Sequence, residues 1–474
     1  MIEHYPSQAL SGLTLAIATI LLLAWARWRS RPTLPLPPGP PSEFLLGHSR
    51  VIPKENAAAV YAKWSKEYNS DIIHVRSLGR STVVLNSADV ARDILDKKGA
   101  NFCDRPRFTL LKIKLLQTSF SNTNKPKTWE TSLRRLAVAI VLQVSYGTQV
   151  LEDDDPYIQI ANDAMYATGN GGVPAYIRYL PDCIVRDWSL RFARQWRWAI
   201  KKLHDVPFAA AQAEYHRDDH HRNTSLAHHL LREYKDKEFR GQEQQWSLDD
   251  IKGAAGAVFI AGADTTWATC VIFVLNMVLH PEIQEKAQQE LDAVIGTDRL
   301  PDFSDRPALV YIEHIVQEIY RWSPLAPLGI PHKSLHDDIY KGMLIPKGIS
   351  EVTRWGGYLI STRTVVYANA YAMAHDERVY KNPHDFNPDR YEAGEPFPVG
   401  NFGFGRRVCV GRFLADNSVW ITVATMLSVL RFCKKMSSDG KPIEPRVRFT
   451  NGGTWYVDSP SVPMACFTLT HSLQ

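Results

Sequence analysis

The first long apolar stretch of the chain covers residues 9–26, and Arg27, Arg29 and Arg31 follow it at once. A stretch of this length is just long enough to cross a bilayer as a helix. Because arginines next to a membrane span stay on the cytoplasmic side, we expect residues 1–31 to form an anchor, with the rest of the chain in the cytosol. A cleavable signal peptide is the alternative. It fits less well, because no basic segment precedes the apolar run and no small-residue cleavage site precedes the arginines.

Residues 32–41 are rich in proline, which fixes φ and stiffens the chain, so this segment predicts a short hinge before a globular body. Helical periodicity then covers 57–68 and 88–97. Between these helices, 72–76 and 81–85 have the β-branched composition of two paired strands. The globular body therefore begins with helices and a small sheet.

The longest helical pattern runs over residues 247–280. It opens on Ser247-Leu-Asp-Asp250, a variant of the capping box, and Pro281 follows its far end. At a rise of about 1.5 Å per residue, a helix of this length crosses a whole domain. A membrane span is the alternative, but Asp264 and its polar neighbours in the apolar run argue against it. We expect this helix to form the centre of the fold.

The composition excludes several function classes. The chain has 474 residues, a formal net charge of +5 and a pI of about 8.7, which is too weakly basic to predict nucleic-acid binding. The six cysteines form no C-x-x-C pair, which excludes the usual zinc spacings and a disulfide framework and favours a reducing compartment. A solvated helix and loop, not a metal site, is expected around His216, His220, His221, His228 and His229.

One cysteine, Cys409, lies in the glycine-rich segment Phe402-Gly-Phe-Gly-Arg-Arg-Val-Cys-Val-Gly411, just before an apolar helical pattern over 412–430. Glycine adopts backbone angles closed to other residues, so such a loop can fold tightly and approach a flat ligand. Neighbouring arginines and a helix N-terminus both favour the thiolate, the form of cysteine that binds metals. A buried structural cysteine is the alternative. A dinucleotide-binding loop is excluded, because Val408 replaces the third glycine of that motif.

This segment resembles the haem-binding signature of the haem-thiolate monooxygenases, the cytochrome P450 family, at five positions in register: Phe402, Gly405, Arg407, Cys409 and Gly411. The resemblance implies that these residues bind haem b, with Cys409 as the axial ligand of the iron and Arg407 as a partner of a haem propionate. A thiolate ligand pushes electron density onto the iron and favours cleavage of the O–O bond, which is the chemistry of this family.

A second match lies in the middle of the long helical pattern, where Ala261-Gly-Ala-Asp-Thr-Thr266 is similar to the oxygen-activation motif of the family. Small residues let a helix lie against a flat macrocycle, and a threonine hydroxyl can bond to its own helix backbone and open a local groove. The resemblance implies that Thr265 holds O2 and a water molecule and that Asp264 relays protons as a general acid. A purely structural Asp-Thr pair is the alternative.

A third match is Glu318-Ile-Tyr-Arg321, whose glutamate and arginine share one face of a helix and can form a bidentate pair. In the resembled family such a pair joins the arginine of a later segment, which is Arg390 here. This triad is expected to stabilise the haem loop and to take no part in the chemistry. The resemblance further implies that His332 contacts a haem propionate.

The chain departs from the family pattern at two places. The region 110–131 is short and lacks the Trp-x-x-x-Arg pair that holds a haem propionate, because Trp129 and Arg134 are one residue too far apart. Residues 349–363 are an insertion, for which a surface loop is expected because such insertions cost little free energy. Two interpretations of these departures stay open. Either both are real features of the protein, which would then hold haem with fewer contacts, or they reflect wrongly placed exon and intron boundaries in the gene sequence.

The resemblance covers most of residues 36–474 and implies a mainly α-helical cytochrome P450 fold with small β-sheets over 42–474. It implies insertion of one oxygen atom from O2 into a small apolar organic substrate. Among relatives, the chain is similar to fungal secondary-metabolite oxidases such as O-methylsterigmatocystin oxidoreductase. The expected pocket residues are Phe259, Ala263, Leu325, Leu328 and Thr454.

The chain has no nucleotide-binding motif, so its electrons are expected from NADPH–cytochrome P450 reductase, docked near Arg406 and Arg412. Together with the anchor, the resemblance implies a single-pass protein of the endoplasmic reticulum membrane whose catalytic domain lies in the cytosol. Two other functions stay open. One is a haem-thiolate isomerase or dehydratase, which needs no O2; the other is a non-catalytic remnant, which the missing Trp-x-x-x-Arg pair would explain.

Overall fold

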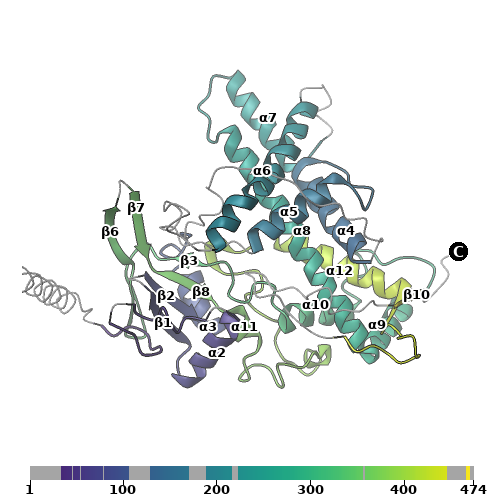
Figure 1. The fold of residues 1–474 in the computed structure, drawn as a ribbon. Coiled ribbons are helices and arrows are strands. Elements are labelled where there is room, and N and C mark those ends of the chain that lie inside the picture. The colour runs from purple at the N-terminus through teal and green to yellow at the C-terminus, as the bar shows by residue number, and fades with distance from the viewer. Residues whose placement is uncertain are drawn as a thin grey trace, which may run out of the picture.

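The computed structural model describes residues 34–44, 46–53, 55–77, 80–105, 129–169, 188–215, 223–355, 358–445 and 466–469. The expected membrane anchor lies outside these residues, and so does most of the short region at 110–131. Within them the protein is mainly α-helical with small β-sheets, as the sequence predicts (Figure 1).

Helices make up most of the described chain. They are α2 (Ala57–Glu67), α3 (Ala88–Ala91), the π-helix η1 (Arg92–Lys97), α4 (Trp129–Tyr146), α5 (Pro156–Gly169), α6 (Trp188–Tyr215), α7 (Leu226–Phe239), α8 (Leu248–Leu279), α9 (Pro281–Val294), α10 (Val310–Trp322), α11 (Ala370–Ala374), the 3-10 helices η4 (Pro388–Arg390) and η5 (Gly405–Arg407), and α12 (Arg412–Val429). The strands are β1 (Ile72–Ser77), β2 (Arg80–Leu85), β3 (His332–Lys333), β4 (Asp338–Tyr340), β5 (Met343–Ile345), β6 (Gly348–Trp355), β7 (Tyr358–Arg363), β8 (Val365–Ala368), β9 (Leu430–Cys433) and β10 (Cys466–Leu469).

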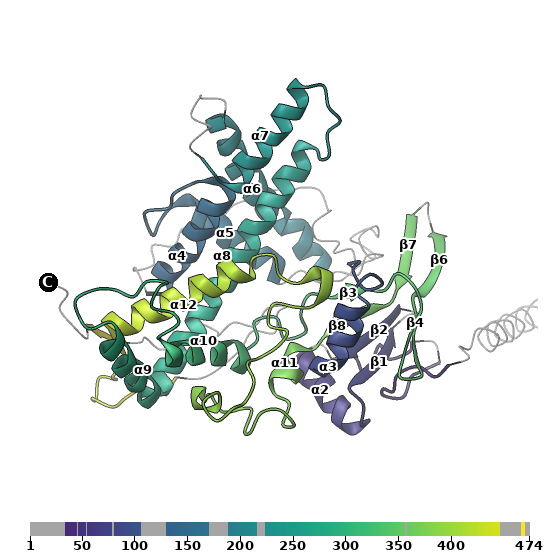
Figure 2. The same cartoon turned by 180° about the vertical axis from the view of Figure 1, so that it is seen from behind.

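Helix α8 runs through the helical part of the molecule, with other helices around it (Figures 1 and 2). The predicted capping box fixes its start: the Ser247 hydroxyl accepts the Asp250 N–H, and the Asp250 carboxylate accepts the Ser247 N–H. In the described part of the chain it is the one helix long and apolar enough to cross a membrane, yet most of its apolar stretch is buried inside the fold. It is therefore a core helix, as expected.

Two hydrophobic cores meet along α8. Its first half packs against α4, α5, α6 and α7, with Tyr146 and Phe259 in edge-to-face contact. Its second half packs against α9, α10 and α12, where Phe273 and Trp420 are completely buried. Each Å² of apolar surface removed from water contributes about 25 cal/mol, so both cores hold α8 in place.

Two strands near the start of the described chain and two later strands form a four-stranded sheet in the order β1-β2-β8-β3. β1 and β2 are antiparallel, whereas β8 joins β2 in parallel, with Val83 opposite Val366. Because side chains alternate between the faces of a sheet, one face packs on α3 and η1 and the other on α2. The strands predicted at 72–76 and 81–85 are thereby confirmed.

The insertion at 349–363 forms most of a β-hairpin and is not the irregular loop that we expected. β6 and β7 pair antiparallel from Gly348 opposite Arg363, with an irregular register between Ile349 and Thr353. A hairpin satisfies most of its own backbone hydrogen bonds. It can therefore be inserted ahead of β8 while β8 keeps its place in the sheet.

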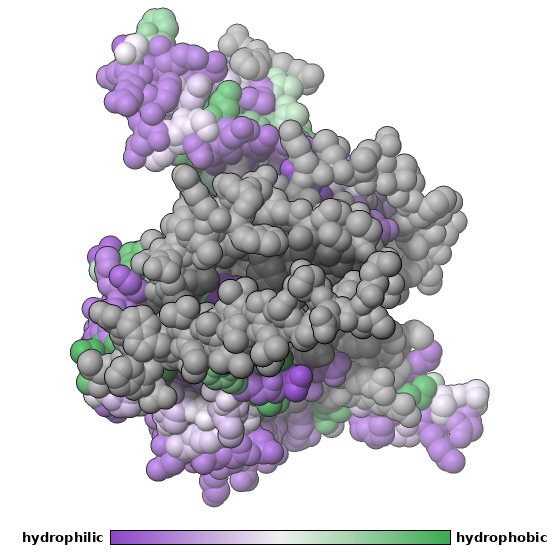
Figure 3. Space-filling model, turned by 60° about the vertical axis from the view of Figure 1, so that its left-hand side comes forward, coloured by the Kyte–Doolittle hydropathy of each residue, from purple (hydrophilic) through white to green (hydrophobic). Residues whose placement is uncertain are grey.

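Helix α7 forms one end of the molecule, and the surface in this region is largely hydrophilic (Figure 3, top). His229 on α7 is exposed, as expected for a solvated helix. His228 is completely buried instead, with its Nδ1 3.0 Å from the Ser225 hydroxyl. The expectation of a solvated side chain is therefore wrong for His228, while the three earlier histidines lie outside the described residues. No cluster of three metal-binding side chains occurs in the described part of the chain.

Candidate active site

The cysteine loop is held against η1 by one glycine. Gly405 has a φ of +60°, in the left-handed region that glycine favours, and its N–H donates to the Asp96 carboxylate. A Cβ at this position would collide with the Leu95 carbonyl group. The signature glycine at 405 is therefore required both by its own backbone conformation and by the close approach of η1.

Cys409 lies immediately before α12. Its N–H donates to the Phe402 carbonyl oxygen at 2.8 Å, which closes the loop, and its own carbonyl accepts from the Arg412 guanidinium at 3.0 Å. Gly411 is the N-cap of α12, so the thiol stands two residues before the cap. The Cys409 side chain is exposed and so accessible to a ligand.

A small, mostly apolar cavity of about 50 Å³ lies between α8, α10, α12 and the cysteine loop. Each wall contributes side chains, among them Thr265 from α8, Leu325 after α10, Phe402 from the loop and Ala415 from α12. The loop motif and the α8 motif are thus brought together at one cavity, although they are far apart in the sequence.

The Thr265 hydroxyl donates to the Ala261 carbonyl oxygen of its own helix at 2.8 Å. One turn later, the Thr269 hydroxyl donates to the Thr265 carbonyl oxygen at 2.9 Å. Side-chain bonds of this kind compete with the backbone ladder and locally distort a helix. The hydrogen bond predicted for Thr265 is confirmed, and both threonines line the cavity.

The Asp264 carboxylate is directed toward α4 and is not part of the cavity lining. It lies 3.6 Å from the Arg134 guanidinium, which also lies 3.6 Å from the centre of the Trp267 ring. Asp264 is only 5% exposed; burial raises its pKa, and the Arg134 charge opposes this rise. The structure thus separates the two predicted catalytic residues: Thr265 lines the cavity, whereas Asp264 faces the helix that carries Arg134.

Three basic side chains gather beside the cysteine loop. Arg407 donates to the Cys103 carbonyl oxygen at 2.7 Å, and Arg105 donates to the Arg407 carbonyl oxygen at 3.4 Å. His332 is buried, and its Nδ1 lies 2.8 Å from the Phe102 carbonyl oxygen. The structure therefore brings Arg407 and His332 together, as the propionate prediction requires.

The electrostatics of this cluster fit an anionic group. Burial, with the charges of Arg105 and Arg407, lowers the pKa of His332 to about 4. Burial and the charge of Arg407 also lower the pKa of Arg105. Guanidinium groups that repel each other are stabilised by a carboxylate between them, and haem carries two propionates. The sequence prediction missed Arg105, although it lies in the segment Asn101-Phe-Cys-Asp-Arg-Pro106, which looks like the family pattern.

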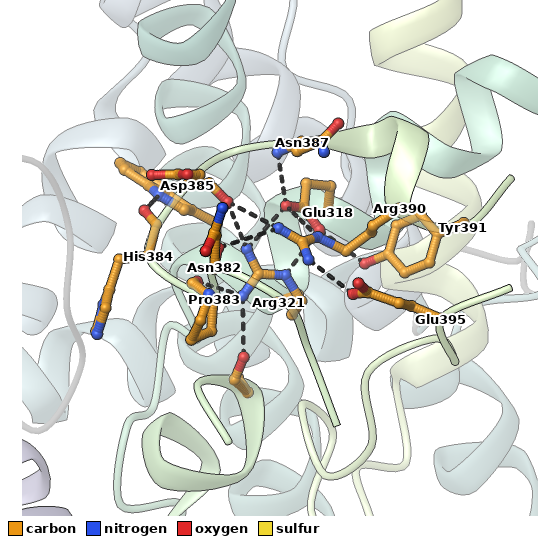
Figure 4. Close-up of polar contacts among 12 residues, drawn as sticks. Glu318, Arg321, Asn382, Pro383, His384, Asp385, Asn387, Arg390, Tyr391 and Glu395 are labelled. Atoms are coloured by element: carbon orange, nitrogen blue, oxygen red, sulfur yellow. Dashed lines mark hydrogen bonds and ion pairs between the residues drawn. The ribbon is translucent and has the colours of Figure 1, made fainter. Parts of the chain in front are cut away.

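Glu318 and Arg321 of α10 form a buried bidentate ion pair, as predicted (Figure 4). The Arg321 Nε and Nη2 each donate to the Glu318 carboxylate at 2.8 Å, and Arg390 donates to it at 3.1 Å. The Tyr391 hydroxyl adds a bond at 2.9 Å, and both arginines also donate to main-chain carbonyls between residues 374 and 385. A buried pair is stable only when such hydrogen bonds satisfy its charges, and here they do.

The triad links the cavity to the segment that precedes the cysteine loop. Tyr320, next to Arg321 on α10, lines the cavity and contacts the Phe402 ring edge-to-face with centroids 5.5 Å apart. Arg390 belongs to η4, just before the loop. The triad therefore fixes the cavity wall relative to the loop, which is the structural role expected from the sequence.

The predicted pocket residues divide into two groups. Leu325 lines the cavity, as expected. Phe259 and Ala263 lie instead in the core between α8 and the helices α4 to α7, and Leu328 packs against the sheet and α2. Thr454 lies outside the described residues. A helix presents several faces, and the sequence did not show which face of α8 adjoins the cavity.

These parts together define the class of protein. A mostly apolar cavity between a threonine-bearing helix and a cysteine loop suits a flat apolar cofactor, and the cationic cluster beside the loop suits its propionates. The fold and the site are therefore those of a haem-thiolate protein.

Comparison with known proteins identifies the family. The sequence model for Cytochrome P450 matches residues 123–453. A cytochrome P450 monooxygenase of Armillaria gallica is 29% identical, with 93% of this chain and 94% of that protein covered. Cytochrome P450 monooxygenase 136 of Postia placenta is 31% identical (94% and 92% covered), and cytochrome P450 monooxygenase ple1 of Rhodocybe pseudopiperita is 31% identical (90% and 89% covered). The chain belongs to the cytochrome P450 family.

Family membership establishes the cofactor and the class of reaction. Members bind haem iron through a cysteine thiolate and act as monooxygenases on a substrate with O2. The predicted family, cofactor and enzyme class are confirmed. The individual roles of Cys409, Asp264, Thr265, Arg407 and His332 stay predictions that this geometry supports.

Proposed function

We propose that this monooxygenase is anchored in the endoplasmic reticulum membrane by residues 1–31 and oxidises a small apolar molecule of secondary metabolism, with electrons from NADPH–cytochrome P450 reductase. The observation that carries the proposal is that Thr265 of α8 and Phe402 of the cysteine loop line one mostly apolar cavity, which brings the two family motifs to a single site. The arginines that follow the apolar stretch at 9–26 support a cytosolic catalytic domain.

In the proposed site each residue has a separate task. Cys409 supplies the thiolate for the iron, while Arg105, Arg407 and His332 hold the propionates. Bound haem supplies the activation of O2. The Thr265 hydroxyl donates and accepts hydrogen bonds beside the site of oxygen binding, and Asp264 donates protons to that site.

The surface around Cys409 suits the proposed reductase. Val410 and Phe413 are 89% and 68% exposed, and the Arg412 guanidinium lies 4.3 Å from the centre of the Phe413 ring. Arg406, on the same loop, is exposed. Exposed apolar side chains flanked by arginines favour a partner whose contact surface is acidic around an apolar centre.

The test begins with the full-length chain co-expressed with the reductase. The reduced carbon-monoxide complex is expected to show the red-shifted absorption band of a thiolate ligand. Cys409→Ala should abolish this band, whereas Cys433→Ala on β9 should keep it. Absence of the band in the unchanged protein would contradict the proposal and favour a non-catalytic remnant.

Isotope labelling then tests the reaction itself. With NADPH, the reductase, labelled O2 and a mixture of apolar fungal metabolites, one labelled oxygen atom is expected in the product. Product that forms without reductase and carries no label would instead identify an isomerase or dehydratase.

A further inference from the structure

The contact between α4 and α8 brings a charged side chain to the proposed proton donor. An added Cβ at Gly262 would collide with Val141, so the two helices approach each other closely beside Asp264. At this contact the Arg134 guanidinium faces the Asp264 carboxylate at 3.6 Å. The same guanidinium lies 3.6 Å from the centre of the buried Trp267 ring, a cation–π contact that holds it in place.

Arg134 is the charged side chain that acts on this carboxylate within the described part of the chain. The neighbours of Asp264 on α8, Thr265 and Trp267, are neutral. A buried carboxylic acid that gives up its proton leaves a buried carboxylate, which is costly unless a cation faces it. Arg134 supplies that cation, and its planar guanidinium can lie on an aromatic ring and face a carboxylate at the same time, which an ammonium group does less well.

We propose that Arg134 is a positioning residue for proton delivery: it holds Asp264 on the α4 side of α8 and stabilises the carboxylate that each proton transfer leaves behind. This inference rests on the proposed function of Asp264 as the acid. In each transfer the O–H bond of Asp264 breaks, the proton moves toward the acceptor beside Thr265, and the carboxylate stays paired with Arg134 until it takes up a proton from solvent.

The first test measures the ionisation of Asp264 by infrared titration of the haem-loaded protein, with Asp264→Asn to assign the carboxyl band. Arg134→Gln is expected to raise the pKa of Asp264 by about one unit or more, a tenfold change in its ionisation constant. Arg134→Lys, which keeps the charge, should restore most of the difference. The matched control is Arg135→Gln, because Arg135 is the next residue on α4 and pairs with Asp153 at 2.8 Å; this control should leave the titration unchanged.

The second test measures NADPH oxidation by the protein with its reductase and O2, in water and in deuterium oxide. Arg134→Gln should slow the rate by about tenfold and enlarge the solvent isotope effect, as expected when a general acid is impaired. Arg135→Gln should do neither.

The two tests separate this inference from the proposed function. Suppose that the thiolate band is present but the pKa of Asp264 and the rate of NADPH oxidation are the same in Arg134→Gln as in Arg135→Gln. The role of Arg134 is then overturned, and the proposed function stands. If Arg134→Gln fails to fold, Arg134→Lys decides, because an ammonium group faces the carboxylate less well: a pKa of Asp264 raised by a fraction of a unit supports the charge pairing, and a pKa equal to that of the unchanged protein overturns it. If the unchanged protein lacks the band, the proposed function itself has failed.

Discussion

At the scale of single residues, the site depends on which face of α8 each side chain occupies. Thr265 and Asp264 are neighbours in the sequence, yet one lines the cavity and the other faces Arg134 on α4. Successive residues of an α-helix point about 100° apart, so adjacent residues of a motif meet different surroundings. The motif at residues 261–266 therefore combines a group that lines the cavity with a group buried outside it.

The Thr265 hydroxyl gives the residue-scale prediction. Thr265→Ala removes the hydrogen bond to the Ala261 carbonyl and the one hydroxyl proposed to stabilise bound oxygen. We expect the thiolate band to persist, while product formation falls by about tenfold or more, in the range of one lost acid–base or hydrogen-bonding group. The share of NADPH that ends as hydrogen peroxide should rise. Thr265→Ser, which keeps a hydroxyl, should recover most of the coupling; equal coupling in the alanine variant would contradict the role of Thr265.

At the scale of elements, the packing of the cysteine loop on η1 gives a test of stability. Gly405→Ala forces a methyl group against the Leu95 carbonyl and places alanine at a positive φ. Overpacking of this kind costs about 1–3 kcal/mol, and thermal unfolding should show it together with weaker haem retention. The matched control is Gly296→Ala, because Gly296 has a φ of +79° with no atom within 4 Å of an added Cβ. Equal losses in both variants would show that the contact with η1 contributes nothing.

The elements also show how far the sequence alone leads. Periodicity, caps and motifs predicted α8, the first strands, the Glu318–Arg321 pair and the cysteine loop, because each is specified by residues close together in the chain. The third member of the triad, Arg390, came from the family resemblance. The burial of His228, the hairpin of β6 and β7, the role of Arg105 and the pairing of Asp264 with Arg134 were not predicted. The contacts of Arg105 with Arg407 and of Arg134 with Asp264 join segments far apart in the sequence, and local patterns carry no information on such contacts. The hairpin is local, but residues 349–363 matched no part of the family pattern, and the burial of His228 depends on how α7 packs.

At the scale of the whole molecule, α8 belongs to both helical cores and also lines the cavity, whereas the four-stranded sheet has hydrophobic clusters of its own. His74 of β1 is buried in that sheet, with its Nε2 3.2 Å from the Ser81 hydroxyl. Burial, with smaller effects from His48 and Arg76, lowers the pKa of His74 to about 4. His74 therefore takes up its proton at a lower pH in the folded protein than in the unfolded chain.

This difference makes the stability of the whole chain depend on pH. Between the unfolded pKa of about 6.5 and the folded value of about 4, the unfolded state binds more protons, so the free energy of unfolding must fall as the pH falls through that range. The full loss for His74 is about 3 kcal/mol. Urea unfolding of the haem-loaded protein from pH 7 to pH 4 measures it, and His74→Gln should flatten the slope. His229→Gln, at an exposed position on α7, should leave the slope unchanged. If His74→Gln keeps the slope of the unchanged protein, the His74 ring titrates alike in the folded and unfolded states, and the acid sensitivity belongs to other groups.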